Sequence, residues 1–127
     1  SVIRGLGQLL LQTGKMDEGV ALLKSYLEEL PKRENPWGLW SSTLSTLAWS
    51  LYKDGQFREA LSVFRELGEL HRGEKVQYAD PFDGAGWCLL RLNKASSAKK
   101  EFLKAIAISP RYENRLLGLE AVTGELQ

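Results

Sequence analysis

Apolar residues recur along the chain at intervals of three and four positions, the spacing that places side chains on one face of an α-helix. The spacing occurs three times, at Ile3, Leu6 and Leu10, at Leu44, Leu47 and Leu51, and at Phe82, Ala85 and Leu89. No segment of useful length alternates apolar and polar residues as a β-strand would. Turn signals end these stretches at Thr13-Gly14, Asp54-Gly55 and Leu92-Asn93. The pattern predicts helices over 2–13, 16–30, 36–54, 57–71, 80–92, 95–108 and 112–123.

The predicted helices form three copies of one unit when the chain is aligned on Gly14, Gly55 and Asn93. Each copy has a small residue before and after its turn, in the pairs Gly7 and Gly19, Ala48 and Ala60, and Gly86 and Ala98. Nine positions after the turn residue comes a large one: Leu23, Phe64 or Phe102. Facing small residues would let the two helices of a unit approach closely, and we expect the large residue to fill space toward the next unit. Such units bury their remaining faces by stacking.

These registered positions resemble the tetratricopeptide repeat, in which one helix carries Leu-Gly between large residues and the next carries Ala, an aromatic residue, Ala and Pro. The matching residues are Ile3, Leu6, Gly7, Leu10, Leu23 and Pro31, then Leu44, Leu47, Ala48, Leu51, Ala60 and Phe64, then Phe82, Gly86, Leu89, Ala98, Phe102, Ala105 and Pro110. The resemblance implies an all-α fold, a right-handed superhelical solenoid of about seven helices. Its units would span about 1–34, 37–75 and 79–110. A terminal helix at 111–124 would follow, resembling another first helix through Leu117-Gly118.

The spacing between units is longer than the 34 residues of the family. Gly55 follows Gly14 by 41 residues, and Asn93 follows Gly55 by 38. The extra residues lie between units, so we expect the helix of 36–54 to be extended, with Asn35 as its N-cap and Pro36 at its first position. Stacking at these connections is expected to be irregular.

Composition narrows the function. The 127 residues suffice for one domain, and 17 basic against 16 acidic residues give a net charge of +1, without the positive excess of nucleic-acid or membrane-surface proteins. His71 and Cys88 are the only residues of their types. Neither an internal disulfide nor a cysteine-based zinc site can form, and we expect His71 at a helix end and Cys88 in the core. We therefore expect no enzyme activity, no metal and no cofactor.

The resemblance implies a concave surface that is lined by the first helix of each unit and binds a peptide or helix of a partner protein. The residues carried over to it are Arg4, Gln8, Trp49, Tyr52, Lys53, Trp87 and Arg91. Aromatic walls and a basic edge would suit a peptide with apolar anchors and acidic character. In the alternative interpretation, Trp49 and Trp87 only pack between neighbouring first helices. The carboxylate clamp of some family members is not expected, because its Lys and Asn sites hold Arg4, Gln8, Ser45, Thr46 and Trp49.

Trp37 and Trp40 extend the apolar stripe of the second unit by one turn. They either cover the open end of the first unit near Tyr26 and Leu30, or form a second, exposed patch for a partner or for self-association.

The sequence thus predicts a protein–protein interaction scaffold. The alternatives are a structural, self-associating segment of a larger assembly protein and, less favoured by the charge balance, an RNA-binding helical repeat. The first residue is Ser1 rather than Met, and we expect a piece of a longer protein. No residue decides the compartment: the cytoplasm is the default, and the bacterial periplasm or envelope follows from the breadth of the family. No membrane insertion is expected.

Overall fold

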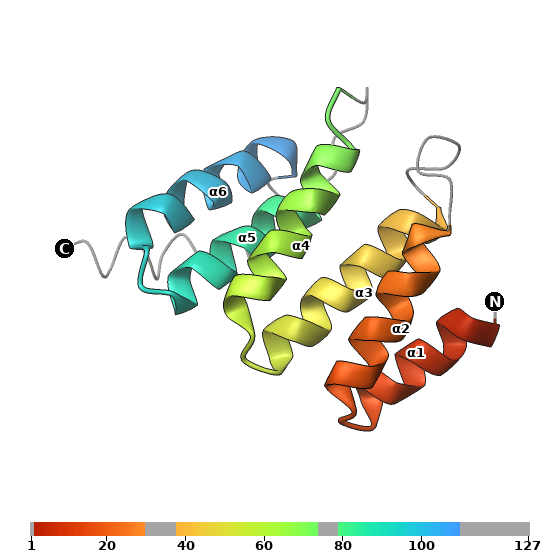
Figure 1. Ribbon diagram of the computed structural model, residues 1–127. Helices are drawn as coiled ribbons and strands as arrows, with labels where there is room; N and C mark the ends of the chain where they lie inside the picture. The colour runs from red at the N-terminus through yellow and green to blue at the C-terminus, as the bar shows by residue number, and fades with distance from the viewer. Residues whose placement is uncertain (1, 30–37, 74–78, 110–127) are drawn as a thin grey trace.

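The computed structural model describes residues 2–29, 38–73 and 79–109, which form six α-helices and no strand. The helices are α1 (Val2–Gln12), α2 (Met16–Glu28), α3 (Leu39–Lys53), α4 (Phe57–Leu70), α5 (Asp80–Arg91) and α6 (Ala95–Ile108). Figure 1 shows them as three helical hairpins that follow one another in chain order. The all-α solenoid expected from the sequence is confirmed.

Helix boundaries agree with the sequence prediction to within two residues except at the start of α3. That helix begins at Leu39, and Gly38, which the prediction placed inside it, lies in the turn before it. The predicted N-cap Asn35, Pro36 and the seventh helix at 112–123 lie outside the described residues.

Each hairpin turn uses the same backbone geometry. Gly14, Gly55 and Asn93 have φ angles of 85°, 84° and 61°, in the left-handed region where glycine and asparagine are best tolerated. The amide of the residue after each one reaches back to the carbonyl five positions earlier: Lys15 to Leu10, Gln56 to Leu51 and Lys94 to Leu89, all at 2.9 Å. This hydrogen bond closes a Schellman motif, which ends the first helix and returns the chain for the second.

Within a hairpin, the large residue of the second helix packs on the small residue of the first. A Cβ atom at Gly7 would lie 2.6 Å from the side chain of Leu23, and one at Gly86 would lie 2.6 Å from the Phe102 ring. The expected pairing of small residues with each other is therefore wrong for these glycines: each receives a large side chain. The close approach of the helices remains, because no space is left for a Cβ atom.

Stacking between units is uneven. α4 packs along much of α5, and a Cβ atom at Gly84 of α5 would overlap the ring of Phe64 from α4. By contrast, α2 makes only a light contact with α3. The central core is built from units two and three, from the side chains of Leu44, Leu47, Leu51, Phe64, Leu67, Cys88, Leu89 and Phe102. The irregular stacking expected at the longer connection is observed between units one and two.

Candidate functional site

A groove of about 980 Å³ lies between α1 and α3, the first helices of units one and two. α1 contributes Gln8, Leu11 and Gln12, and α3 contributes Ser41, Ser42, Ser45, Thr46, Trp49, Ser50 and Lys53. Five hydroxyls and two carboxamides dominate this surface. All seven groups can both donate and accept hydrogen bonds without carrying charge.

The helical period of α3 explains why hydroxyl groups gather there. Ser42, Thr46 and Ser50 are spaced by four residues, so they lie on one face of the helix. The leucines of the same helix lie on the buried side. Sequence reasoning placed Ser45 and Thr46 on the concave surface but missed Ser41, Ser42 and Ser50, although the four-residue spacing was a usable signal.

Trp49 forms a wall of the groove and is held in place by its neighbours. Its indole Nε1–H donates to Oδ2 of Asp80 at 3.1 Å, and Ser45 Oγ donates to the same oxygen at 3.0 Å. The ring packs edge-on against Phe64 and Tyr52, with centroids 4.8 Å and 5.7 Å away. The ring is only partly buried, so it is fixed in orientation and still presents a surface to the groove.

Side chains also link α3 to α5. Arg91 Nε donates to the hydroxyl of Tyr52 at 3.2 Å, and this hydrogen bond raises the pKa of the Arg91 guanidinium. Trp87 is partly buried and packs edge-on against Phe102 at 5.4 Å. The predicted residues of unit three therefore serve, at least in part, to join neighbouring helices.

The seven predicted concave residues thus fall into three groups. Gln8, Trp49 and Lys53 line the groove together. Arg4 lies beside it and donates from Nη2 to Ser42 Oγ, which links α1 to α3. Tyr52, Trp87 and Arg91 do not line the groove.

Comparison with known families assigns the repeats. Residues 44–73 and 82–112 each match the tetratricopeptide repeat family. These two segments of the chain are tetratricopeptide repeats. The two matches cover the second and third repeats, and the α1–α2 hairpin has the same turn geometry as these two.

Solved structures agree with this fold. The first tetratricopeptide domain of Spaghetti (RPAP3), bound to the HSP90 peptide SRMEEVD, is 18% identical with a TM-score of 0.78, covering 98% of this chain and 90% of that one. The Sgt2 domain of Aspergillus fumigatus is 17% identical, with a TM-score of 0.73 and coverage of 98% and 76%. The yeast Sti1 TPR2AB domain complex with pHSP90 is 17% identical, with a TM-score of 0.77 and coverage of 98% and 46%. A search of curated proteins found no match.

The predicted second patch does not form around Trp40. Its side chain is 5% exposed and belongs to the core of the repeats, with Leu27 and Leu44. The interpretation of Trp40 as part of an exposed patch is therefore wrong, because the first and second repeats together enclose it. Trp37 lies outside the described residues.

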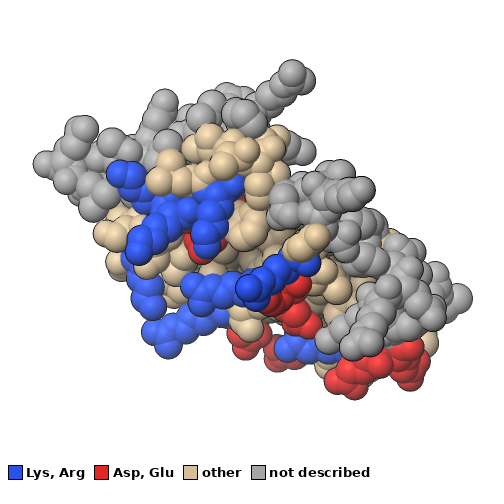
Figure 2. Space-filling view, turned by 90° about the horizontal axis from the view of Figure 1, so that it is seen from above, with Lys and Arg blue, Asp and Glu red and all other residues tan. Residues whose placement is uncertain are grey.

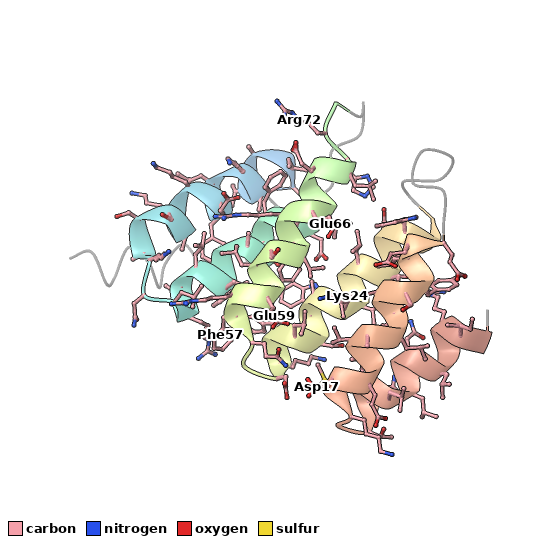
Figure 3. The ribbon with its side chains drawn as sticks, viewed as in Figure 1. Asp17, Lys24, Phe57, Glu59, Glu66 and Arg72 are labelled. Atoms are coloured by element: carbon pink, nitrogen blue, oxygen red, sulfur yellow. The ribbon has the colours of Figure 1, made fainter. Side chains whose placement is uncertain are left out.

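A smaller opening of about 380 Å³ lies where the second helix of repeat one meets repeat two. Its floor is apolar, and its edges carry Lys24 and Glu28 from α2 and Glu66 from α4. Figure 3 shows Lys24 on the side of α2 that faces α4. The opening follows from the light contact between α2 and α3.

The reactive side chains of the repeats are buried. His71 lies at the C-terminal end of α4, as expected. Its Nε2 lies 2.7 Å from Ser41 Oγ, and this hydrogen bond joins α4 to α3. His71 is 3% exposed and Ser41 is 6% exposed. Cys88 is fully buried, which raises the pKa of its thiol to about 12.

Within the described ranges, no three His, Cys, Asp or Glu side chains gather as metal ligands. The described helices include none with the length and hydropathy for a membrane span.

Proposed function

We propose that this protein binds an extended peptide segment of a partner protein in the groove between α1 and α3. The observation that carries the proposal is the lining of the groove: neutral hydrogen-bonding side chains on both helices, with Trp49 fixed as one wall. A volume of about 980 Å³ accommodates several residues of a peptide.

The lining suits a peptide main chain. An extended peptide presents N–H and C=O groups in alternation, and hydroxyl or carboxamide side chains can bond to either. The exposed part of Trp49 offers an apolar surface for one side chain of the ligand, and tryptophan is among the residues that most often dominate binding energy. Because Trp49 is already held by Asp80, little ordering entropy is lost on binding.

Charge sets the expected preference of the groove. Lys53 is the cation among the lining residues and has no ion-pair partner within the described part of the chain. We therefore expect an acidic residue in the ligand near Lys53. Ser45, Thr46 and Trp49 occupy sites where a carboxylate clamp would need Lys and Asn, so we expect an internal segment rather than a terminal carboxylate. The Spaghetti domain holds its peptide with the same fold, which supports peptide binding as the mode.

The test begins with peptides selected from a displayed random library on the wild-type protein. Fluorescence anisotropy of the selected peptides then gives the Kd for the wild type and for Gln8→Ala, Lys53→Glu and Trp49→Ala. We expect the Kd to rise at least tenfold in each variant. Lys100→Glu on the exposed side of α6 is the matched control for charge reversal and should leave the Kd unchanged. Peptides that bind all three groove variants as tightly as the wild type would refute the proposal.

Association with a second copy is the other candidate function, and the outer face of α1 favours it. Ile3, Leu6 and Leu9 are 44%, 49% and 54% exposed, whereas the equivalents of the first two in repeat two, Leu44 and Leu47, are 2% and 1% exposed. The exposed face carries no charge that would oppose a second copy. Sedimentation equilibrium over a range of concentrations tests it: a dimer should form in the wild type and be lost in Leu6→Ser, and a monomer at every concentration would exclude it.

A further inference from the structure

A second groove, of about 500 Å³, lies between α4 and α6 and crosses the start of α5. These are the second helices of repeats two and three, so the groove is separate from the one between α1 and α3. Its floor is apolar and consists of Phe64, Pro81, Phe82 and Ala85. Phe82 is partly exposed, whereas the other three are buried.

Gly68 makes this groove wider than its equivalent in the first repeat, the opening of about 380 Å³ that Leu27 lines. In the repeat register Gly68 corresponds to Leu27 in the first repeat and Ile106 in the third, both large and apolar. A Cβ atom at Gly68 would lie 3.6 Å from the Cβ of Pro81 and 4.0 Å from the Phe82 ring, which are ordinary contact distances.

Close packing does not explain this glycine. At Gly84 and Gly86, an added Cβ atom would collide with a phenylalanine ring, but at Gly68 it would fit. A glycine inside a helix costs about 1 kcal/mol relative to alanine, and here no tight helix contact offsets that cost. The missing side chain leaves free the space that Leu27 occupies in the first repeat.

The rim of the groove is positive. Arg72 pairs with Glu69 at 3.0 Å, and Lys104 pairs with Glu101 at 3.4 Å while lying 5.8 Å above the Phe82 ring. Arg65 is exposed and has no partner in the described part of the chain, which leaves one unpaired guanidinium beside the apolar floor.

The surroundings of the groove share this charge. Four lysines, Lys94, Lys99, Lys100 and Lys104, lie along α6 and its N-cap, against Glu101 alone. Figure 2 shows most of the Lys and Arg side chains of that face toward the α6 end, on the left as in Figure 1. Figure 3 shows Arg72 beyond the end of α4. The field over the groove therefore favours an acidic ligand over a basic one.

We propose that this groove binds an acidic peptide segment that inserts one large apolar side chain over Gly68 and places a neighbouring carboxylate on Arg65. The open space beside Gly68 takes the anchor, and the partly exposed ring of Phe82 supplies apolar contact. Arg65 supplies a bidentate partner for the carboxylate. The space that Leu27 occupies in the first repeat is here occupied by the partner.

The probe is a capped tetrapeptide with glutamate at both ends around leucine and phenylalanine, titrated into the full ¹⁵N-labelled chain and followed by NMR. We expect saturable amide shifts at Gly68, Phe82 and Ala85 in the wild type. Gly68→Leu should abolish these shifts, because the leucine side chain would occupy the space that the apolar anchor needs, as Leu27 does in the first repeat. Arg65→Glu, on an exposed position where the fold is retained, should raise the Kd at least tenfold.

Three controls make the result specific. A tetrapeptide with lysine in place of both glutamates should cause no shifts. Gly5→Ala, where an added Cβ meets nothing within 4 Å, should bind like the wild type. Lys53→Glu should also bind normally, which separates this groove from the one between α1 and α3.

Other results would overturn the proposal. They are the absence of shifts at millimolar peptide, equal shifts with the lysine tetrapeptide, and shifts that persist in Gly68→Leu or are unchanged in Arg65→Glu. Displacement of the peptide by a single-stranded oligonucleotide of higher affinity would assign the basic rim to nucleic acid instead.

Discussion

The tight seam between α4 and α5 predicts that Gly84 cannot carry even a methyl group. A Cβ atom at Gly84 would overlap the ring of Phe64, whose Cδ1 would lie 2.6 Å away. Phe64 is 0% exposed and is packed edge-on by Trp49 at 4.8 Å, so the ring cannot turn aside. The substitution Gly84→Ala therefore forces the second and third repeats apart or distorts the ring.

Two effects of opposite sign set the magnitude. Alanine in the interior of a helix is better than glycine by about 1 kcal/mol. Overpacking a rigid core costs roughly 1–3 kcal/mol and sometimes more, and the overlap with several ring carbons places Gly84 toward the upper end. We expect a net loss of about 1–2 kcal/mol in the free energy of unfolding, which lowers the Tm by roughly 3–10 °C in a chain of this size.

Urea denaturation followed by circular dichroism measures the loss, and Gly5→Ala is the control. Gly5 is also inside a helix, but an added Cβ meets nothing within 4 Å there, so only the propensity gain remains. Gly5→Ala should leave stability unchanged or raise it by up to about 1 kcal/mol. The two Gly→Ala changes should thus differ in sign.

The double variant Gly84→Ala with Phe64→Leu tests the cause. Phe64→Leu alone should cost about 1–2 kcal/mol through lost packing. In the double variant the smaller side chain relieves the collision, so the combined loss should fall short of the sum by about 1 kcal/mol or more. Additive losses, or a Gly84→Ala protein as stable as the wild type, would show that the helices are not in the contact described.

Three further predictions concern other parts of the repeats. By urea denaturation, Leu47→Ala should lower the free energy of unfolding by about 2–4 kcal/mol and Leu6→Ala by less than about 1 kcal/mol, because these equivalent residues are 1% and 49% exposed. Equal losses would contradict the exposure of α1. The raised pKa of Cys88 means that its thiol stabilises the fold below about pH 9 and that this contribution falls as the pH rises toward 12, by about 1.4 kcal/mol per unit. Cys88→Ala should therefore show a shallower loss between pH 9 and 10.5, and parallel curves would refute the burial of the thiol. Asp80→Ala should lower the free energy of unfolding by about 1–2 kcal/mol and blue-shift or broaden the fluorescence of Trp49. Asp80→Asn keeps a hydrogen-bond acceptor and should cause a smaller loss, and no difference between the two variants would argue against the hydrogen bond.

The helices could be predicted closely because local signals agree with the fold. The bounds of α6 match the prediction. Asn93 was placed at a turn by the Leu92-Asn93 turn signal, and its φ of 61° lies in the same left-handed region as the φ angles of Gly14 and Gly55. The predicted start of α3 was wrong. Asn35 and Pro36 form a pattern that is typical of a helix start, whereas the helix begins after Gly38.

The candidate site was predicted less completely because it depends on how the repeats stack. Gln8, Trp49 and Lys53 were predicted as binding residues from their position on first helices, and they line one groove. The bond from Trp49 to Asp80 joins residues 31 positions apart, and no pattern within either helix encodes it. Whether Trp49 contacts a ligand stays a prediction.

Two helical glycines show even more clearly that the sequence alone does not reveal how the repeats stack. Gly68 and Gly84 both interrupt helices and look alike in sequence, yet one leaves an opening and the other receives a ring from the neighbouring repeat. What separates them is the residue on the facing helix, which depends on the stacking of repeats two and three.

Both proposed grooves lie where the repeat departs from its own regularity. The first follows the longest spacing between turns, 41 residues, where α2 makes only a light contact with α3 and the first two repeats are loosely joined. The second is widened by a single missing side chain at Gly68, where α4 meets the start of α5. Since the two departures have separate causes, filling one groove should leave the other intact, and Gly68→Leu should not change binding between α1 and α3.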